Sequence, residues 1–211
     1  MNPPEQAVRL VVLGSGTSIP SGARSSSGYW LDDGTTRVRL DCGSGSVHAM
    51  ARFELPWAEL DYQVFSHFHV DHFSDLPALL FALKWARSQA RVKPLTLLGP
   101  RGLRERVHAL DVAFGKDLLD QDFPVLIREL SPGDRFPLTE RAELEVRRAP
   151  HTEESLALKL TFGATSIGYT GDTAFSEQLC EFFRDVDVLV GECSFLEGTE
   201  GSLHLDARGL G

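Results

Sequence analysis

Side chains that bind metal ions are concentrated in one short stretch of this sequence. Residues 66–72 read SHFHVDH, which holds three of the chain's seven histidines and one aspartate. His67 and His69 are two residues apart after an expected strand, so their imidazoles project to the same side and can bind one ion. Asp71 and His72 follow where the chain turns, and they direct an oxygen and a nitrogen towards a second point nearby. The clustering favours a metal site over a polar loop whose histidines bond to backbone carbonyls.

Alternating short strands and helices must position this stretch. Two acidic residues stand beside glycine where expected strands end, Asp41 in LDCG and Asp172 in YTGD. The pattern predicts two similar halves packed face to face, with sheets inside and helices outside. Strands are expected at residues 9–13, 29–31, 37–40, 62–65, 95–98, 125–130, 143–149, 155–162 and 186–190, and helices at 75–90, 101–114 and 176–184.

Composition limits the class of protein. The 211 residues are 42% hydrophobic, which is enough for one substantial core. A net charge of −9 argues against broad attraction to polyphosphates. The sequence has no apolar run long enough for a membrane span, and its first residues lack signal-peptide features, so we expect a cytoplasmic protein. Cys42, Cys180 and Cys193 are scattered and form no CxxC pair, and we expect buried thiols.

The motifs resemble those of a known family. HFHVDH at residues 67–72 looks like the HxHxDH signature of the metallo-beta-lactamase-fold hydrolases, and that family's downstream ligands appear in order as His151 in RAPHTEES and Asp172 in GYTGDT. Residues 13–31 and LDCGSG at residues 40–45 resemble the opening of the ribonuclease Z-like branch, which includes cyclic-nucleotide and other small phosphodiesterases. The resemblance implies an α+β fold, a four-layer αββα sandwich with two mixed sheets inside and helices outside. It would form a single domain over residues 1–211, with halves of roughly 1–120 and 121–211.

The resemblance also implies a ligand set. His67, His69 and His151 would hold one metal ion, Asp71 and His72 the other, and Asp172 would bridge both. Asp41 would be a supporting residue.

Two catalytic residues are implied as well. Asp71 would accept a proton from the attacking water, and His204 in SLHLDAR would protonate the leaving group, oriented by Glu192. The alternatives are a surface histidine at position 204 and a helix cap at Asp172.

Such a site implies hydrolysis by a hydroxide that bridges two divalent ions. We expect two zinc ions per chain, with manganese or iron as alternatives, and a phosphodiesterase of the ribonuclease Z-like type. The alternatives are a hydrolase of sulfate esters, thioesters or lactones, and a mononuclear iron oxygenase or non-hydrolytic metal-binding protein. Metal analysis separates hydrolysis from the last alternative, because two zinc or manganese ions per chain would support hydrolysis and one iron ion would support oxygen chemistry.

The expected partner is a small-molecule or flexible phosphodiester. RNA stays among the candidate substrates, but the interval of 172 − 151 = 21 residues leaves no room for the arm that grips transfer RNA in ribonuclease Z, and the charge of −9 also disfavours transfer RNA. We expect no membrane partner and include a homodimer among the expected states. The branch normally supplies a further histidine after a later strand, so we expect a C-terminal segment beyond Gly211 and a weaker second metal site without it.

Overall fold

The computed structural model describes residues 7–86, 91–196 and 203–210, and the chain divides into two compact units. One unit comprises residues 9–129, and the other comprises residues 1–8 and 130–211. The sequence placed the boundary between the halves near residue 120. Among the described residues, no helix is both long and apolar enough to cross a membrane.

The unit of residues 9–129 is built on a six-stranded sheet with the order β1-β2-β3-β4-β5-β6. Neighbouring strands are antiparallel from β1 to β3, and β3–β4 and β4–β5 are parallel, so the sheet is mixed. Its strands are β1 (Arg9–Gly14), β2 (Gly28–Asp32), β3 (Arg37–Leu40), β4 (Tyr62–Val64), β5 (Leu95–Pro100) and β6 (Val125–Leu130).

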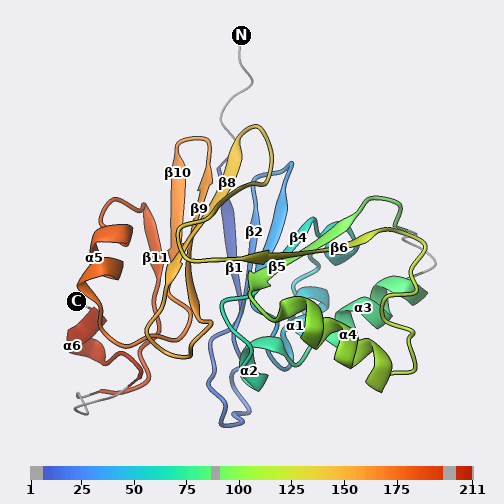
Figure 1. Cartoon of the computed structure of the whole chain (residues 1–211), viewed down its shortest axis with the longest axis horizontal. Coiled ribbons are helices and arrows are strands. Elements are labelled where there is room, and N and C mark those ends of the chain that lie inside the picture. The colour runs from blue at the N-terminus through green and yellow to red at the C-terminus, as the bar shows by residue number, and fades with distance from the viewer. Residues whose placement is uncertain (1–6, 87–90, 197–202, 211) are drawn as a thin grey trace. The chain divides into compact units, whose positions relative to one another are not determined.

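Helices cover one face of this sheet (Figure 1). Apolar side chains of three helices, among them Met50, Leu80 and Val107, share a buried cluster with Trp30 and Phe65 from the strand side. Burial of these side chains is the main stabilising contribution to the unit. The helices are α1 (Ser46–Arg52), α2 (Val70–Phe73), α3 (Leu76–Trp85) and α4 (Leu103–Ala113), with a 3-10 turn, η1, at Trp57–Glu59.

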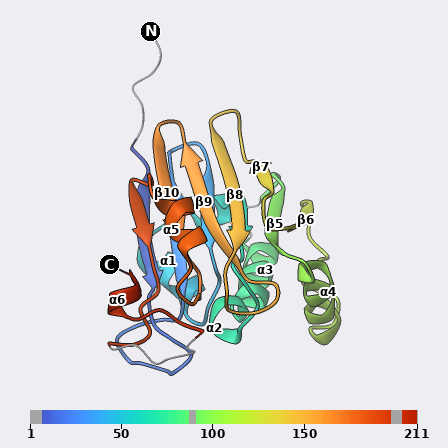
Figure 2. The ribbon, with the colours of Figure 1, turned by 60° about the vertical axis from the view of Figure 1, so that its left-hand side comes forward.

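The second unit has a five-stranded sheet with the order β11-β10-β9-β8-β7. The pairs from β7 to β10 are antiparallel and β10–β11 is parallel, so this sheet is also mixed. Figure 2 shows α5 beside this sheet, where Phe182 and Phe183 pack with Ala157 of β9. The elements are β7 (Arg135–Pro137), β8 (Ala142–Arg148), β9 (Leu156–Phe162), β10 (Thr165–Tyr169), α5 (Glu177–Phe183), β11 (Val188–Val190) and α6 (Ala207–Leu210).

Several expectations differ from the structure. The helix expected at residues 75–90 ends at Trp85, and its last part, residues 87–90, lies outside the described residues. Cys42 is buried as expected, but Cys180 and Cys193 are exposed, so the expectation of three buried thiols was wrong. A lone cysteine carries no periodic pattern that would distinguish the two environments.

Parallel strand pairs in each sheet determine where polar side chains gather. In a parallel pair both carboxyl ends lie at the same edge of the sheet. Leu40 of β3 is level with Val64 of β4, so the residues after each strand, Asp41 and the 66–72 segment, are brought together. Tyr169 of β10 is level with Val190 of β11, which brings Asp172 near Glu192 in the same way.

Candidate metal centre

Four predicted ligands of the 66–72 segment lie together after β4. The rings of His67 and His69 have centroids 4.7 Å apart, and those of His67 and His72 have centroids 4.2 Å apart. One carboxylate oxygen of Asp71 lies 3.7 Å from Nε2 of His72. His67 and His72 are buried, whereas His69, the N-cap of α2, is exposed. Three imidazoles and a carboxylate at this spacing match the nitrogen and oxygen donors that zinc prefers.

The buried carboxylate of Asp41 organises this cluster. Asp41 is fully buried, and its Oδ1 accepts a hydrogen bond from the Ser66 backbone N–H at 2.7 Å. Its Oδ2 lies 2.8 Å from the Ser66 hydroxyl and 2.7 Å from Nδ1 of His72. An ionised carboxylate only accepts hydrogen bonds, so both of these groups must donate to it. The Ser66 oxygen, 3.0 Å from Nδ1 of His67, is then the acceptor for that ring's N–H.

This network assigns a tautomer to two histidines. With Nδ1 carrying the proton in both His67 and His72, the lone pair of each neutral ring is on Nε2, the atom that would bind a metal ion. Carboxylate and hydroxyl partners of this kind orient metal-binding histidines and raise their basicity. Burial alone would raise the pKa of Asp41. The pKa nevertheless lies below its ordinary value, because attraction to His72 and His67 and the donated hydrogen bonds favour the ionised form.

A close approach of two backbones fixes the position of Asp71. A Cβ atom built on Gly43 would lie 1.9 Å from the Asp71 carbonyl oxygen, so only glycine fits there. The Cys42 N–H donates to the His72 carbonyl at 2.7 Å, and the Asp75 N–H donates to the Cys42 carbonyl at 2.8 Å. The LDCG segment therefore holds the histidine loop by its main chain as well as by Asp41.

In the other unit, Asp172, Glu192 and His204 gather at the ends of β10 and β11. Each offers a ligand atom within 4.8 Å of the others. Nδ1 of His204 lies 3.1 Å from both carboxylate oxygens of Glu192 and 3.9 Å from Oδ2 of Asp172. Burial raises the pKa of Glu192, hydrogen bonds from Ser194 and the Thr173 N–H act in the opposite direction, and nearby Asp172 adds to the rise. The Glu192–His204 contact is the geometry expected of an orienting pair.

His151 reaches the same group from the loop after β8. Its Nδ1 lies 3.1 Å from the Leu203 carbonyl oxygen, which can only accept, so Nδ1 donates and the lone pair of the neutral ring is on Nε2. That nitrogen lies 3.8 Å from Oδ2 of Asp172, and the His151 and His204 ring centroids are 4.7 Å apart. His67, His72 and His151 thus share one arrangement, in which Nδ1 donates a hydrogen bond and the lone pair of the ring is on Nε2. This donor chemistry fits divalent metal ions.

Sequence reasoning did not single out Ser66, although it begins the SHFHVDH stretch. Its role depends on Asp41, 25 residues earlier in the chain, and appears only when β3 and β4 pair. His48 and His108 are exposed on α1 and α4 and lie outside the predicted ligand set.

Comparison with solved structures shows which fold the chain has. The metallo-beta-lactamase fold protein YhfI of Bacillus subtilis matches with a TM-score of 0.80 at 21% identity, over 94% of this chain and 78% of YhfI. The short form of human tRNase Z matches with a TM-score of 0.81 at 20% identity, over 95% of this chain and 85% of that protein. The protein has the metallo-beta-lactamase fold, and the predicted fold class is confirmed.

Sequence comparison then gives the family. The family described as Anti-Pycsar protein Apyc1 matches residues 8–210, and the chain belongs to that family. An uncharacterized protein of Mycobacterium tuberculosis is 31% identical over 210 residues, covering 97% of this chain and 75% of the relative. YhfI itself, described as a probable metallo-hydrolase, is 24% identical over 203 residues, covering 92% of this chain and 76% of YhfI.

Proposed function

We propose that the protein is a metal-dependent hydrolase that cleaves phosphodiester bonds. The observation that carries this proposal is the network in which Asp41 and Ser66 set His67 and His72 in the tautomer needed for metal binding. Hydrogen-bond partners that orient the histidine rings are needed at a metal site, whereas the histidines of a polar surface loop need no such orientation. Membership of the family and its metallo-beta-lactamase fold support the same function.

The proposed ligands follow the family resemblance. His67, His69 and His151 hold one ion, Asp71 and His72 hold the second, and Asp172 serves both. Zinc suits the imidazole-rich set, with manganese or iron as alternatives. When bound, two such ions activate water at neutral pH and stabilise the charge that develops on the phosphoryl oxygens.

Two side chains of the protein handle protons in this proposal. Asp71 accepts the proton of the attacking water at its carboxylate. His204, held at Nδ1 by Glu192, donates the proton on its Nε2 to the leaving oxygen. Glu192 also accepts a hydrogen bond from the Thr173 N–H, next to Asp172, so one carboxylate supports both His204 and the Asp172 loop.

The proposed substrate is a small or flexible phosphodiester, such as a cyclic nucleotide, rather than transfer RNA. The interval from His151 to Asp172 is occupied by the hairpin of β9 and β10, whose strands pair in register from Leu158↔Tyr169 to Phe162↔Thr165. A tight hairpin at this position leaves no protruding arm to grip a folded RNA. The chain charge of −9 also weakens long-range attraction to a polyanion.

The test is a metal-dependent activity screen with a matched pair of histidine variants. We expect the protein loaded with zinc or manganese to hydrolyse a chromogenic phosphodiester in preference to phosphomonoester, sulfate ester, thioester and lactone probes. His69→Ala should lose most bound metal and activity while the far-UV circular dichroism spectrum is retained, because His69 is exposed and outside the core. His48→Ala, which removes another exposed histidine of the same unit, should change neither. Preference for another ester, or full metal retention in His69→Ala, would contradict the proposal.

A further inference from the structure

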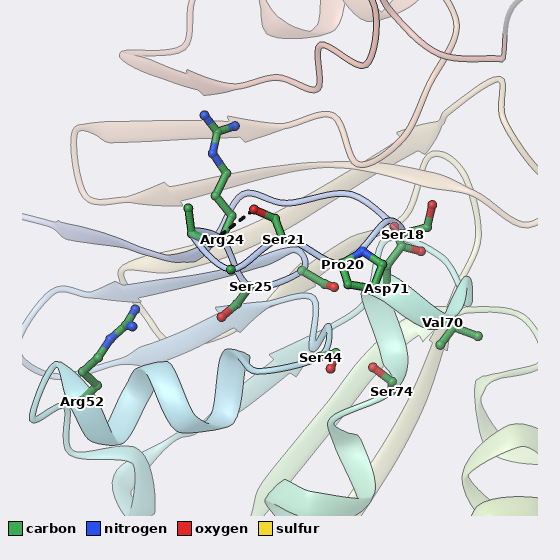
Figure 3. Close-up of a pocket in the computed structure, with 13 residues that line it drawn as sticks. Ser18, Pro20, Ser21, Arg24, Ser25, Ser44, Arg52, Val70, Asp71 and Ser74 are labelled. Carbon is green, nitrogen blue, oxygen red and sulfur yellow. Dashed lines mark hydrogen bonds between the residues drawn. The ribbon is translucent and has the colours of Figure 1, made fainter.

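A polar pocket of about 370 Å³ lies beside Asp71, within the unit of residues 9–129. Its walls come from the loop after β1, from Ser44, from Arg52 at the end of α1 and from the α2 region. Figure 3 shows Arg24 and Arg52 towards one side of this view, and Asp71 and Ser18 towards the other. The volume falls within the range of roughly 300–1,000 Å³ that is usual for small-molecule sites.

The lining residues determine what the pocket can bind. They include six serines and two arginines, with Asp71 as the single acidic residue, and none of them is aromatic. Hydroxyl and guanidinium groups suit an anion with several acceptor oxygens, and guanidinium groups match phosphate geometry well. A nucleobase would instead require an aromatic platform for stacking, which this lining lacks. The chemistry favours a phosphate or a sugar phosphate.

The charge of the two arginines is available to a ligand. Arg24 and Arg52 are both exposed, and among the described residues neither has an ion pair with a carboxylate. The guanidinium carbon of Arg52 lies 4.9 Å from the centroid of the Phe53 ring, a contact that leaves its charge uncompensated. In a chain with a net charge of −9, an uncompensated pair of positive charges beside a pocket marks a local site for an anion.

The pocket wall is anchored at its base. The Ser26 N–H donates to the Ser44 carbonyl at 3.0 Å, and the Gly16 N–H donates to the Ser25 carbonyl at 2.8 Å. A Cβ atom on Gly14 would lie 2.0 Å from the Ser26 carbonyl oxygen, which shows how closely the two ends of the loop approach. An anchored wall reduces the ordering cost of binding a ligand.

We propose that this pocket binds a phosphate group of the substrate other than the one that is hydrolysed, with Arg24 and Arg52 as the residues that recognise it. The inference rests on the proposed function, because Asp71 lines the pocket and is also a proposed ligand of the second metal ion. A substrate that reaches Asp71 with its scissile phosphodiester can place a second phosphate among the serines and arginines. Among small phosphodiesters, one that carries an additional phosphate is then preferred over one with a single phosphate, such as a cyclic mononucleotide.

The first experiment measures binding without turnover. Ribose 5-phosphate and ribose are titrated into the full chain in low-salt buffer and followed by calorimetry. We expect ribose 5-phosphate alone to bind, and we expect Arg24→Gln and Arg52→Gln each to weaken binding by about fivefold, as for a partly solvated charged hydrogen bond. Arg101→Gln is the matched control, because Arg101 is an exposed arginine of the same unit outside the pocket.

Two results would overturn the phosphate site. One is equal binding of ribose and ribose 5-phosphate, or no binding of either. The other is a failure of the variants to separate the pocket from other sites. If both pocket variants bind ribose 5-phosphate as tightly as the wild type, the sugar phosphate binds at the metal site instead. If Arg101→Gln weakens binding as much as the pocket variants do, the attraction is nonspecific. Because no hydrolysis is needed, arginine-dependent binding in a protein that cleaves no phosphodiester would refute the proposed function while the phosphate site stands.

The second experiment tests whether the phosphate belongs to the substrate. A dinucleotide with a 5′-phosphate is compared with the same dinucleotide without it, and KM and kcat are determined for both. We expect the 5′-phosphate to lower KM in the wild type, and Arg52→Gln to lose about fivefold more in kcat/KM on the phosphorylated substrate than on the other. An equal loss of kcat/KM on both substrates would show that the pocket does not bind a second phosphate of the substrate.

Discussion

The variant Asp41→Asn tests the network that sets the histidines. Asparagine fits this position, because Asp41 has φ 52° and asparagine tolerates the left-handed region. The size of the side chain is also unchanged. The substitution removes the charge and replaces one acceptor oxygen by an NH2 group, which then faces a donor: either the Ser66 N–H or the pair formed by the Ser66 hydroxyl and His72 Nδ1.

The magnitude follows from these three contacts. A hydrogen bond to a charged group contributes about 1.5–3 kcal/mol, so the loss of one or two should lower the free energy of unfolding by about 2–4 kcal/mol. His72 and Ser66 are also released to change tautomer or rotamer, and loss of such a partner lowers metal affinity by about 10–100-fold. Competition with a chromogenic chelator measures the zinc Kd, and urea unfolding measures the stability.

Asp33→Asn is the matched control. Asp33 lies in the turn between β2 and β3, and its Oδ1 accepts three hydrogen bonds from Thr35 and Thr36 that an asparagine oxygen can still accept. The control removes the same charge from the same unit, so we expect a change in stability of about 0.5 kcal/mol or less and an unchanged zinc Kd. Equal zinc affinity in Asp41→Asn and the wild type would refute the argument that Asp41 sets the tautomers.

The pH dependence of stability is an independent test of the ionisation of Asp41. Its pKa is lowered on folding, so the folded state binds this proton less readily than the unfolded state does. The stabilisation is therefore present above the ordinary value of 3.8 and is lost as the pH falls through the lower folded value. We expect the difference in unfolding free energy between the wild type and Asp41→Asn to shrink over that acidic range. A constant difference would contradict the assigned ionisation.

Three further predictions concern Asp71, Gly43 and the cysteines. Asp71→Ala should lower kcat by about 100-fold or more with little loss of the first metal ion, because Asp71 is proposed to serve the second ion and the attacking water, and metal analysis beside kinetics checks both parts. Gly43→Ala should destabilise the protein by about 3 kcal/mol through the 1.9 Å approach to the Asp71 carbonyl, whereas Gly22→Ala, with nothing within 4 Å, should be nearly neutral in urea unfolding. Burial raises the pKa of the Cys42 thiol to about 12, so iodoacetamide at mildly alkaline pH should label the exposed Cys180 and Cys193 while Cys42 reacts only in urea, as peptide mass spectrometry would show.

The sequence predicted most strands, because apolar runs such as RLVVL and LTLL mark them clearly and glycine or proline ends them. It did not predict α1, since the N-cap residue of this helix is Gly45, with φ 84°, and the helix is only seven residues long. Short helices of this kind are stabilised by packing, here of Ala49 and Met50 into the core, and have little periodic signal of their own.

The candidate site was predictable to the extent that its chemistry is local in sequence. Three histidines and an aspartate within the SHFHVDH segment can be recognised as candidate metal ligands from the sequence alone. The roles of the Ser66 hydroxyl and of Arg52 cannot be predicted in this way, because each depends on a neighbour that is brought close only by the tertiary structure. Arg52 becomes part of the pocket only because the loop after β1 lies beside it. The ligand roles of His151 and Asp172 and the proton-donor role of His204 stay predictions.

The network around Asp41 also has an entropic consequence. A side chain that becomes ordered only when a ligand arrives costs about 0.5–1.5 kcal/mol in lost rotamer freedom. The rings of His67 and His72 have already lost that freedom on folding, through their bonds to Ser66 and Asp41. An arriving ion therefore meets two imidazoles that need no rearrangement, and its affinity gains roughly 1–3 kcal/mol over that for the same residues on a mobile loop. His69 is the exposed histidine of the 66–72 segment, so its motion should limit how quickly the ion is captured and released.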